Sequence, residues 1–359
     1  MKPRVAIIYL CYNILEYLPE VVSSFEELNY PNDRLGIAMV PNASPDGIER
    51  VIRDDLLPRS KKDLPEVVLI EEGKNDGFAE GNNKGIRWAL ENDFDYIFLN
   101  NGDLTLHPDA INELVNLAES DERIGSAQSM VVYWDDHEQV NTSGGEFHVA
   151  GYGYARDNLG RLEDLKYENG DEIIYASGAA VLYRASALRR VGLLEKGFFM
   201  YHEDLELGLR LKMAGYTNHL CTTSFAYHDY HFSRNPMKFA WMELYRWVVV
   251  LSYYKVATLV VLFPLLMVIE LGTWVMAVKN NWLKAKLWAY AQAMLPRTWR
   301  LIIRMRKRAQ QLRIIPDTEL LKLVTGKIEG QEANGGIVNR IANPIISVIL
   351  SLLKKVIRW

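Results

Sequence analysis

Short apolar runs alternate with helical segments through the first 120 residues, and this alternation limits the possible folds more than any other feature. Runs with strand character lie at Val5 to Leu10, Leu35 to Val40, Val67 to Ile70 and Tyr96 to Leu99. Segments with helical character follow them at Leu15 to Leu28, Ile48 to Leu56, Gly81 to Glu91 and Pro108 to Ser120. Such alternation predicts a mainly parallel sheet covered by helices on both faces.

A different pattern begins at Ser126. Three further strand-like runs, Ser126 to Trp134, Glu172 to Tyr183 and Asn218 to Tyr227, are joined by polar loops. We expect these runs to add antiparallel pairs to the same sheet. The sequence therefore indicates an α/β fold with a mostly parallel mixed sheet.

Asp103 follows the fourth early strand-like run, in the sequence Asn101-Gly102-Asp103. Open α/β sheets bind ligands beyond the carboxyl ends of their strands, and a carboxylate there can hold a divalent cation against a diphosphate. An Asp that ends a strand is more often a turn former or a helix cap, and Pro108-Asp109 does indicate a helix start. Asp103 alone leaves both interpretations open.

Glu203-Asp204 opens a helical run that stops at Gly215, directly after the aromatic stretch Phe198 to His202. Acidic side chains in a first helical turn ordinarily complement the helix dipole. A carboxylate beside apolar walls also gains the raised proton affinity that a general base needs. We take Asp204 as the candidate base and Glu203 as the next candidate.

The segment Asn75 to Gly85 is rich in glycine and asparagine. Gly77 and two further glycines allow close approach of the backbone to a ligand, and the amides of Asn75 and Asn82 can bond a ribose or a diphosphate. The spacing fits neither a dinucleotide fingerprint nor a Walker loop. The alternative is a loop that only caps the following helix.

Six motifs in chain order resemble those of inverting family 2 glycosyltransferases of the GT-A fold, and rhamnosyltransferase-like members most of all. The resemblance runs from Val5 to about Ser233. The motifs are Tyr9 to Asn13, Pro41 to Gly47, Asn75 to Gly85, Asn101 to Asp103, Ser177 to Ala180 and Tyr201 to Asp204. Each motif alone is weak, but six of them in the family's order make a specific match.

The resemblance implies a role for each matching position. Asp103 and His228 would hold Mg²⁺ or Mn²⁺, with His231 as the alternative to His228. Asp204 would remove the acceptor proton, and Gly178 would contact the acceptor. The donor-binding positions would be Tyr12, Asn13, Asn42, Asn75, Gly77, Asn82 and Asn101.

Two places depart from the family pattern. Pro41 stands where an acidic residue usually contacts the nucleotide, and Asn101 stands where many members carry Asp. The run Glu243 to Trp247 resembles the Gln-x-x-Arg-Trp motif of processive members, with Glu in place of Gln. That resemblance implies that Arg246 contacts the diphosphate and that Trp247 stacks on the acceptor sugar. Aromatic and basic anchors beside a membrane segment explain the same run equally well.

A chain of 359 residues exceeds the usual size of one domain. We expect a catalytic domain over 1–235, a helical membrane-associated region over 236–324, a linker over 325–336 and an amphipathic interfacial helix over 337–359. The net charge of −4 gives no sign of nucleic-acid binding. The first apolar run is too short for a signal peptide, so we expect a cytosolic catalytic domain.

Val256 to Val278 carries one charged residue, Glu270, and is long enough to cross a bilayer. A single crossing would place the basic stretch Arg297 to Arg313 on the outer side, against the positive-inside tendency. Pro264 interrupts the segment near its middle. We therefore expect a membrane hairpin, or interfacial helices that dip into the bilayer and return.

Polar and basic residues recur every three or four positions in the apolar segment 337–359, Lys354, Lys355 and Arg358 among them. This pattern predicts a helix that lies in a membrane surface and uses these basic residues to bind it. A partner-binding or homo-oligomerisation helix is the alternative. The Gly-rich linker before the helix would let it move.

Together these features indicate a membrane-associated, metal-dependent inverting glycosyltransferase at the cytoplasmic face of the cell membrane. The donor would be a dTDP-, UDP- or GDP-sugar, and the acceptor a lipid-linked glycan in polysaccharide biosynthesis. A processive polysaccharide synthase would use the same site but normally needs several spanning helices, and this chain offers at most two. A non-catalytic sugar-nucleotide-binding scaffold is the other alternative, and the intact Asp204 argues against it.

Overall fold

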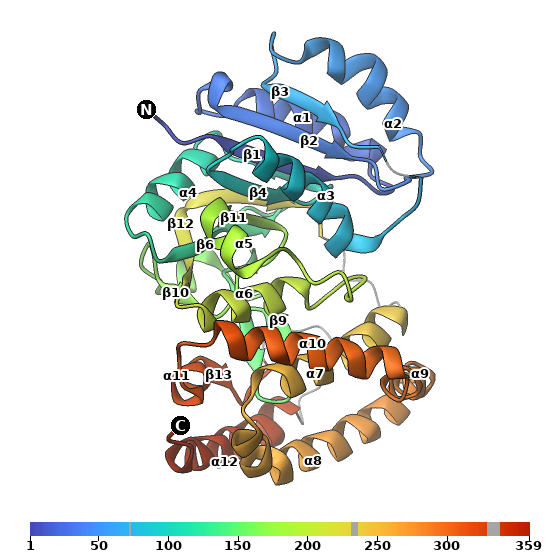
Figure 1. The fold of residues 1–359 in the computed structure, drawn as a ribbon, viewed down its shortest axis with the longest axis vertical. Helices are drawn as coiled ribbons and strands as arrows, with labels where there is room; N and C mark the ends of the chain where they lie inside the picture. Colours follow the sequence, from blue (N-terminus) through green and yellow to red (C-terminus); the bar gives the residue numbers. More distant parts are fainter. Residues whose placement is uncertain (72, 231–235, 329–337) are drawn as a thin grey trace.

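The computed structural model describes residues 1–71, 73–230, 236–328 and 338–359. Within these residues ten strands form one mixed sheet, and helices from the second half of the chain gather at the opposite end of the molecule (Figure 1). The strand order is β10-β12-β6-β11-β4-β1-β2-β3, with β5 paired to β12 and β7 paired to β6. The predicted α/β class with a mixed sheet is confirmed.

The parallel half of the sheet contains β1 (Val5–Leu10), β2 (Leu35–Val40), β3 (Glu66–Leu69) and β4 (Tyr96–Asn100). Its helices are α1 (Leu18–Glu26), α2 (Ile48–Val51, continued by the π-helical turn Ile52–Leu56), α3 (Gly77–Glu91) and α4 (Ala110–Glu119). Strands buried on both faces are almost wholly apolar, which is why the sequence located all four. Because these strands are parallel, their carboxyl ends meet at one edge of the sheet.

The glycine-rich segment Asn75 to Gly85, expected as a ligand loop, is mostly helix, because α3 already begins at Gly77. A Cβ on Gly81 would lie 2.6 Å from Leu10 Cδ1, and one on Gly85 would lie 2.5 Å from Ile8 Cγ2. These two glycines therefore let α3 pack closely on β1 instead of approaching a ligand.

The mixed half of the sheet contains β5 (Leu104–Leu106), β6 (Ile124–Tyr133), β7 (Val140–Thr142), β10 (Glu172–Ile173), β11 (Ala180–Arg184) and β12 (Thr217–His228). As predicted, antiparallel pairs enter here, because β11 lies antiparallel to both β4 and β6. The single strand expected over Glu172 to Tyr183 is wrong. Residues 174–179 leave the sheet between β10 and β11, and they carry Gly178 to the edge where the parallel strands end.

Two helices lie between β11 and β12 in the chain, namely α5 (Ala185–Val191) and α6 (Glu203–Met213). Leu207 and Leu211 of α6 pack in the core beside the sheet, whereas Leu205 and Leu209 pack with the C-terminal helices. The helix is thus apolar on two sides and joins the two layers of the molecule.

A second, three-stranded sheet consists of β8 (Gly145–His148), β9 (Gly153–Ala155) and β13 (Val324–Thr325). β13 lies parallel to β8, although almost two hundred residues separate them in sequence. The linker expected over 325–336 therefore begins inside a strand. Residues 329–336 of that linker lie outside the described residues.

The C-terminal layer contains α7 (Pro236–Tyr253), α8 (Val256–Lys279), α9 (Leu283–Ala293), α10 (Pro296–Leu312), α11 (Asp317–Lys322) and α12 (Asn343–Val356, preceded by the π-helical turn Val338–Ala342). The hairpin expected over Val256 to Val278 is wrong, because α8 runs unbroken through Pro264. By length and composition α8 could cross a membrane, and about a third of its most apolar stretch is buried within the protein.

The basic stretch Arg297 to Arg313 forms α10, and several of its arginines bind partners inside the protein. Arg306 donates to the carbonyl oxygens of Leu251 and Tyr254, both at 2.8 Å, and Arg313 pairs with Asp317 at 2.6 Å. Arg306 thus holds α10 against the end of α7, and Arg313, which follows α10, pairs with the start of α11. Because these charges are used inside the protein, the charge asymmetry read from the sequence does not fix an orientation in a membrane.

The C-terminal helix α12 is fixed against α8 rather than loosely attached. Trp359 Nε1 donates to Thr258 Oγ1 at 2.8 Å, and the Asp317 N–H donates to the Trp359 carbonyl oxygen at 2.8 Å. Lys354, expected at a membrane surface, turns inward and donates to the Val324 carbonyl oxygen at 2.7 Å. Burial lowers the pKa of Lys354. Lys355 and Arg358 remain exposed.

The contact between α6 and residues 174–175 predicts a steric effect at Gly208. A Cβ at this position would lie 2.2 Å from Tyr175 Cβ and 2.8 Å from its Cα, and backbone atoms cannot yield. Gly208→Ala should therefore lower the free energy of unfolding by about 1–3 kcal/mol.

The matched control is Gly272→Ala in α8, where nothing lies within 4 Å of the added Cβ. This change should raise stability by up to about 1 kcal/mol through helix propensity. Thermal unfolding of both variants measures the difference, and equal melting temperatures would contradict the packing of α6 on Tyr175.

Candidate active site

A cleft of about 900 Å³ opens at the edge where the parallel strands end. The loops after β1, β2 and β4 form one side of it, and the start of α6 together with β8 and β9 forms another. Residues of α7, α8 and α9 line its far end. The site thus lies between the sheet and the helical layer, where an open α/β sheet places its ligands.

Most of the residues predicted from the sequence line this cleft. They are Tyr12, Asn42, Asn75, Gly77, Asn101, Asp103, Gly178, Glu203, Asp204 and His228. Among the described residues, four predicted positions do not line it: Asn13, Asn82, Arg246 and Trp247. His231, the alternative metal ligand, lies outside the described residues.

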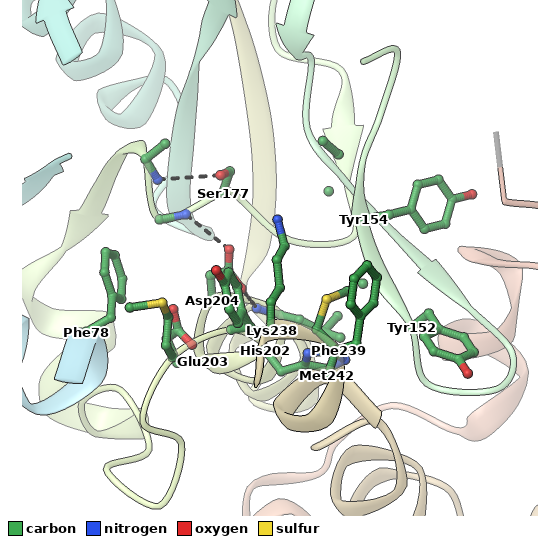
Figure 2. Close-up of a pocket in the computed structure, with 18 of the residues that line it drawn as sticks. Phe78, Tyr152, Tyr154, Ser177, His202, Glu203, Asp204, Lys238, Phe239 and Met242 are labelled. Carbon is green, nitrogen blue, oxygen red and sulfur yellow. Dashed lines mark hydrogen bonds between the residues drawn. The ribbon is translucent and has the colours of Figure 1, made fainter. Parts of the chain in front are cut away.

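Asp204 sits in the first turn of α6 and points into the cleft (Figure 2). Its carboxylate accepts hydrogen bonds from the Leu205 N–H at 2.7 Å and the Gly178 N–H at 3.2 Å. Space at Gly178 is tight, because a Cβ would lie 3.1 Å from the Phe78 ring. Gly178 therefore holds the carboxylate, which adds a positioning role to its predicted contact with an acceptor.

Glu203, the neighbouring acid, is 5% exposed, and its Oε2 has no hydrogen-bond partner. Burial raises the pKa of Glu203 well above its ordinary value, and the charge of Asp204 raises it further. Burial also raises the pKa of Asp204, but its backbone donors oppose that shift. Burial and the charge of Asp204 thus both favour the neutral form of Glu203, whereas backbone donors stabilise the ionised form of Asp204, which favours Asp204 as the base.

His228 lies at the end of β12 and faces Asp103. Its Nδ1 is 3.0 Å from Asn141 Oδ1, and an amide oxygen only accepts, so Nδ1 carries the proton. Nε2 then presents a lone pair to Asp103 Oδ1 at 3.1 Å. In this tautomer both atoms are acceptors, so the pair suits a cation such as a metal ion between them.

The separation of these two atoms fits a divalent ion. Adjacent ligands of an octahedral ion with bonds of about 2.1 Å lie about 3 Å apart. The Asn141 oxygen also orients the imidazole, as outer partners of metal-binding histidines commonly do. Among the described residues no group of three His, Cys, Asp or Glu side chains could hold a metal, so the pair would supply two protein ligands and an ion there would need others.

The loop after β1 is held by Asp46, whose role the sequence analysis missed. Asp46 accepts from the Ile14 and Leu15 N–H groups at 2.9 Å and from the Ser44 hydroxyl at 2.7 Å. Burial would raise the pKa of Asp46, but these hydrogen bonds outweigh it and lower the pKa. The Asn13 N–H donates to Ser44 Oγ at 2.8 Å, so Asn13 belongs to this support and not to the cleft lining.

Asn42 and Asn75 bond each other across the donor side of the cleft. Asn42 Nδ2 donates to Asn75 Oδ1 at 3.0 Å, and Asn42 Oδ1 accepts the Asp76 N–H at 3.0 Å. These two hydrogen bonds fix the turn that starts α3. Asn82 is buried within α3 and donates to the Phe78 carbonyl oxygen at 3.0 Å, so its amide is used inside the helix.

Arg246, predicted to contact a diphosphate, is 1% exposed and lies behind the cleft. It pairs with Glu243 at 2.5 Å and with Glu270, and Lys286 bridges the same two acids at 2.7 and 2.8 Å. The guanidinium also lies 4.7 Å from the Trp247 ring centre. The acids that neutralise Arg246 and Lys286 keep both cations in the interior, so Arg246 is structural.

Lys238, Phe239 and Met242 of α7 line the cleft, and the sequence analysis missed all three. Figure 2 shows Lys238 extending from α7 toward the side of the cleft that carries Asp204. Lys238 and Met242 are one helical turn apart, which places them on one face of a helix. Nothing in the sequence indicates that this face of α7 lines the same cleft as Asp204.

Comparison with known proteins identifies the family. A profile described as "Glycosyltransferase like family 2" matches residues 3–249. This chain therefore belongs to that family, as its motifs predicted.

Two curated relatives are similar over about half of this chain. The low-salt glycan biosynthesis hexosyltransferase Agl10 of Haloferax volcanii is 25% identical over 173 residues, which cover 46% of this chain and 52% of that protein. The rhamnosyltransferase WbbL of Escherichia coli (strain K12) is 25% identical over 184 residues, which cover 48% of this chain and 66% of that protein. The chain thus spans about half to two thirds of the length of these relatives.

Solved structures share the fold at low sequence identity. GalNAc-T7, crystallised with UDP, GalNAc and Mn²⁺, superposes with a TM-score of 0.55 at 11% identity, over 71% of this chain and 49% of that chain. TarS of S. aureus superposes with a TM-score of 0.53 at 13% identity, over 86% of this chain and 54% of that chain. At these identities the likeness confirms the predicted GT-A fold and nothing further.

Proposed function

We propose that this protein is an inverting, metal-dependent glycosyltransferase that moves a sugar from a nucleotide-diphosphate donor to an acceptor hydroxyl. The observation that carries the proposal is that Asp204 and the Asp103–His228 pair open into one cleft on a glycosyltransferase family 2 scaffold. The family relatives named hexosyltransferase and rhamnosyltransferase support a hexosyl donor.

The reaction we propose is a single displacement. The acceptor oxygen attacks the anomeric carbon, the bond from that carbon to the diphosphate oxygen breaks, and the nucleoside diphosphate leaves with the electron pair. Asp204 accepts the acceptor proton as the new bond forms. Attack opposite the leaving group inverts the anomeric configuration. The backbone N–H groups at Asp204 keep its carboxylate directed into the cleft.

Asp103 and His228 would hold the divalent ion, Mg²⁺ or Mn²⁺. A bound ion would neutralise charge on the departing diphosphate, and oxygens of the donor would complete its ligands. Asn101 lines the cleft next to Asp103 and would contribute an amide where a second carboxylate is usual in the family.

We further propose that the protein works at the cytoplasmic face of the cell membrane on a lipid-linked glycan. Large apolar side chains more than half exposed recur along the outer faces of α8 and α12, which lie side by side at the end of the molecule opposite β3 (Figure 1). These side chains are Val256, Val260, Phe263, Val268, Leu271, Val275 and Val278 in α8 and Ile345, Val348, Leu352 and Val356 in α12. An exposed apolar surface of this extent marks an interaction site.

The positions of the charged side chains support a membrane-interface location for this surface. Glu270, the one acid in the apolar stretch of α8, turns inward to Arg246 and so does not lie on the exposed face. Lys355 of α12 and Arg358, which follows the helix, are exposed and suit the anionic cytoplasmic leaflet. Among the described residues α8 alone is long and apolar enough to span a membrane, which gives no support to a processive synthase with a transmembrane channel.

A donor screen tests the proposed activity. Purified protein with Mn²⁺ or Mg²⁺ should release nucleoside diphosphate from a dTDP-, UDP- or GDP-sugar, and a chelator should abolish this release until metal is restored. Asp103→Asn should raise the metal concentration needed for half-maximal release about tenfold or more, because it removes a carboxylate ligand. The matched control, Asp109→Asn, changes an Asp nearby that bonds Asn29 and does not line the cleft. Release insensitive to chelator, or from no donor at all, would contradict the proposal.

The two adjacent acids should respond differently to the same isosteric change. Asp204→Asn should lower kcat by a factor of about 10²–10⁴, because the proton acceptor is lost. Glu203→Gln should keep roughly a third of kcat or more, because burial favours the neutral form of the Glu203 carboxyl and an amide is also neutral. Steady-state kinetics with the donor from the screen measures both. A larger loss for Glu203→Gln than for Asp204→Asn would move the base to Glu203.

The pH dependence of kcat/KM should report the ionisation of Asp204. The active form of Asp204 is ionised, so kcat/KM should fall as pH decreases through the Asp204 pKa. Since burial raises that pKa, the acidic limb should lie above the range of an exposed Asp. It should persist unchanged in Glu203→Gln, and its disappearance in that variant would assign the limb to Glu203.

A further inference from the structure

The catalytic cleft continues beyond Asp204 to the helical layer, and its far end is apolar. Phe239 and Met242 of α7, Met276 and Ala277 of α8, Trp282 and Ala285 give this end most of its lining. The polar residues Glu243, Thr273 and Lys286 also line it, and Lys286 donates to the other two at 2.7 Å, so these groups pair with one another. The Phe239 and Trp282 rings stack with centres 4.0 Å apart and planes at 17°. The Met and Ala side chains beside these rings offer no polar group to a sugar or a nucleotide, whereas a hydrocarbon chain would be removed from water along the whole surface.

Lys238 lies between the base and this apolar end. Its Nζ donates to the Tyr230 hydroxyl at 3.0 Å and lies 5.3 Å from the centre of the Tyr201 ring. Figure 2 shows the Lys238 side chain extending into the cleft, drawn between Asp204 and Phe239. A cation at this position complements an anionic group placed between an acceptor sugar and a hydrocarbon chain.

The apolar end of the cleft adjoins the exposed apolar face of α8. Met276 and Ala277 face the cleft, while their neighbours Val275 and Val278 are 68% and 61% exposed on the outer side of the same helix. A chain that leaves the cleft at this point emerges next to the surface proposed above to meet the membrane.

We infer that the part of the cleft lined by α7, α8 and α9 binds the hydrocarbon chain of a phosphate-linked lipid acceptor, and that Lys238 contacts its phosphate. The acceptor sugar then lies at Asp204. This inference rests on the proposed transferase function and adds to it a site and a chemical class of acceptor.

Three acceptors in detergent micelles test the inference, with the donor identified by the screen. One is a sugar linked through phosphate to a long alkyl chain, the second is the same sugar phosphate with a methyl group, and the third is the long-chain alkyl glycoside without phosphate. The wild-type enzyme should show a KM at least about tenfold lower for the first than for either of the others. This comparison needs no variant.

Two substitutions locate the binding. Met276→Gln should raise KM for both long-chain acceptors about tenfold and leave the methyl phosphate within about twofold. Lys238→Gln should raise KM for both phosphate acceptors about tenfold and leave the alkyl glycoside within about twofold. Met294→Gln, which makes the Met276 change at a residue that is 80% exposed and outside the cleft, is the matched control and should change none of them.

Turnover of the methyl phosphate with no preference for the long chain would overturn the inference and leave the proposed function standing. Equal losses on all three acceptors in Met276→Gln or Lys238→Gln would also overturn it, because they would indicate a general structural effect. Transfer to none of the acceptors, with no nucleotide released, would contradict the proposed function itself.

Discussion

The site depends on how the protein accommodates two adjacent buried carboxyl groups, Glu203 and Asp204. A carboxylate removed from water without partners costs several kcal/mol. The start of α6 meets this cost for Asp204 with two backbone N–H groups, whereas burial and the neighbouring charge raise the pKa of Glu203 and so favour its neutral form. The backbone reaches this arrangement through positive φ angles of 69° at Tyr201 and 70° at His202, a conformation that costs non-glycine residues about 1–3 kcal/mol each. His202 is held in it by a hydrogen bond to the Gly151 carbonyl oxygen at 3.1 Å.

Buried charges of the helical layer neutralise one another and so hold together the helices that close the cleft. Glu243 and Arg246 belong to α7, Glu270 to α8 and Lys286 to α9, and each acid contacts both cations. Removal of any one would leave an uncompensated buried charge, which is why such groups fix helices strongly. The network therefore sets the distance between the helices that form the apolar end of the cleft. The network also explains why Glu270, the one acid of the apolar helix α8, faces the protein interior.

The sequence predicted the parallel half of the fold because strands buried on both faces differ sharply from the amphipathic helices between them. It also predicted that Asp103, His228 and Asp204 belong to one site. The family's motifs lie at the ends of strands and at the start of a helix, and their order along the chain identifies the residues that meet there. The second sheet escaped prediction, because β13 pairs with β8 across a separation that no local period reveals. Arg246 was misplaced for the same reason, since one of its acids, Glu270, comes from another helix. Lys354 fits an interfacial pattern in sequence, yet its amine is used by the Val324 carbonyl oxygen.

The stereochemistry of the product tests the account most directly. Proton NMR of the first product formed from a donor of known anomeric configuration would show whether the new glycosidic bond has the same or the opposite configuration. A single displacement with Asp204 as base predicts the opposite configuration. Retention of configuration would contradict the account, because it would require either two displacements or attack from the face that the diphosphate leaves.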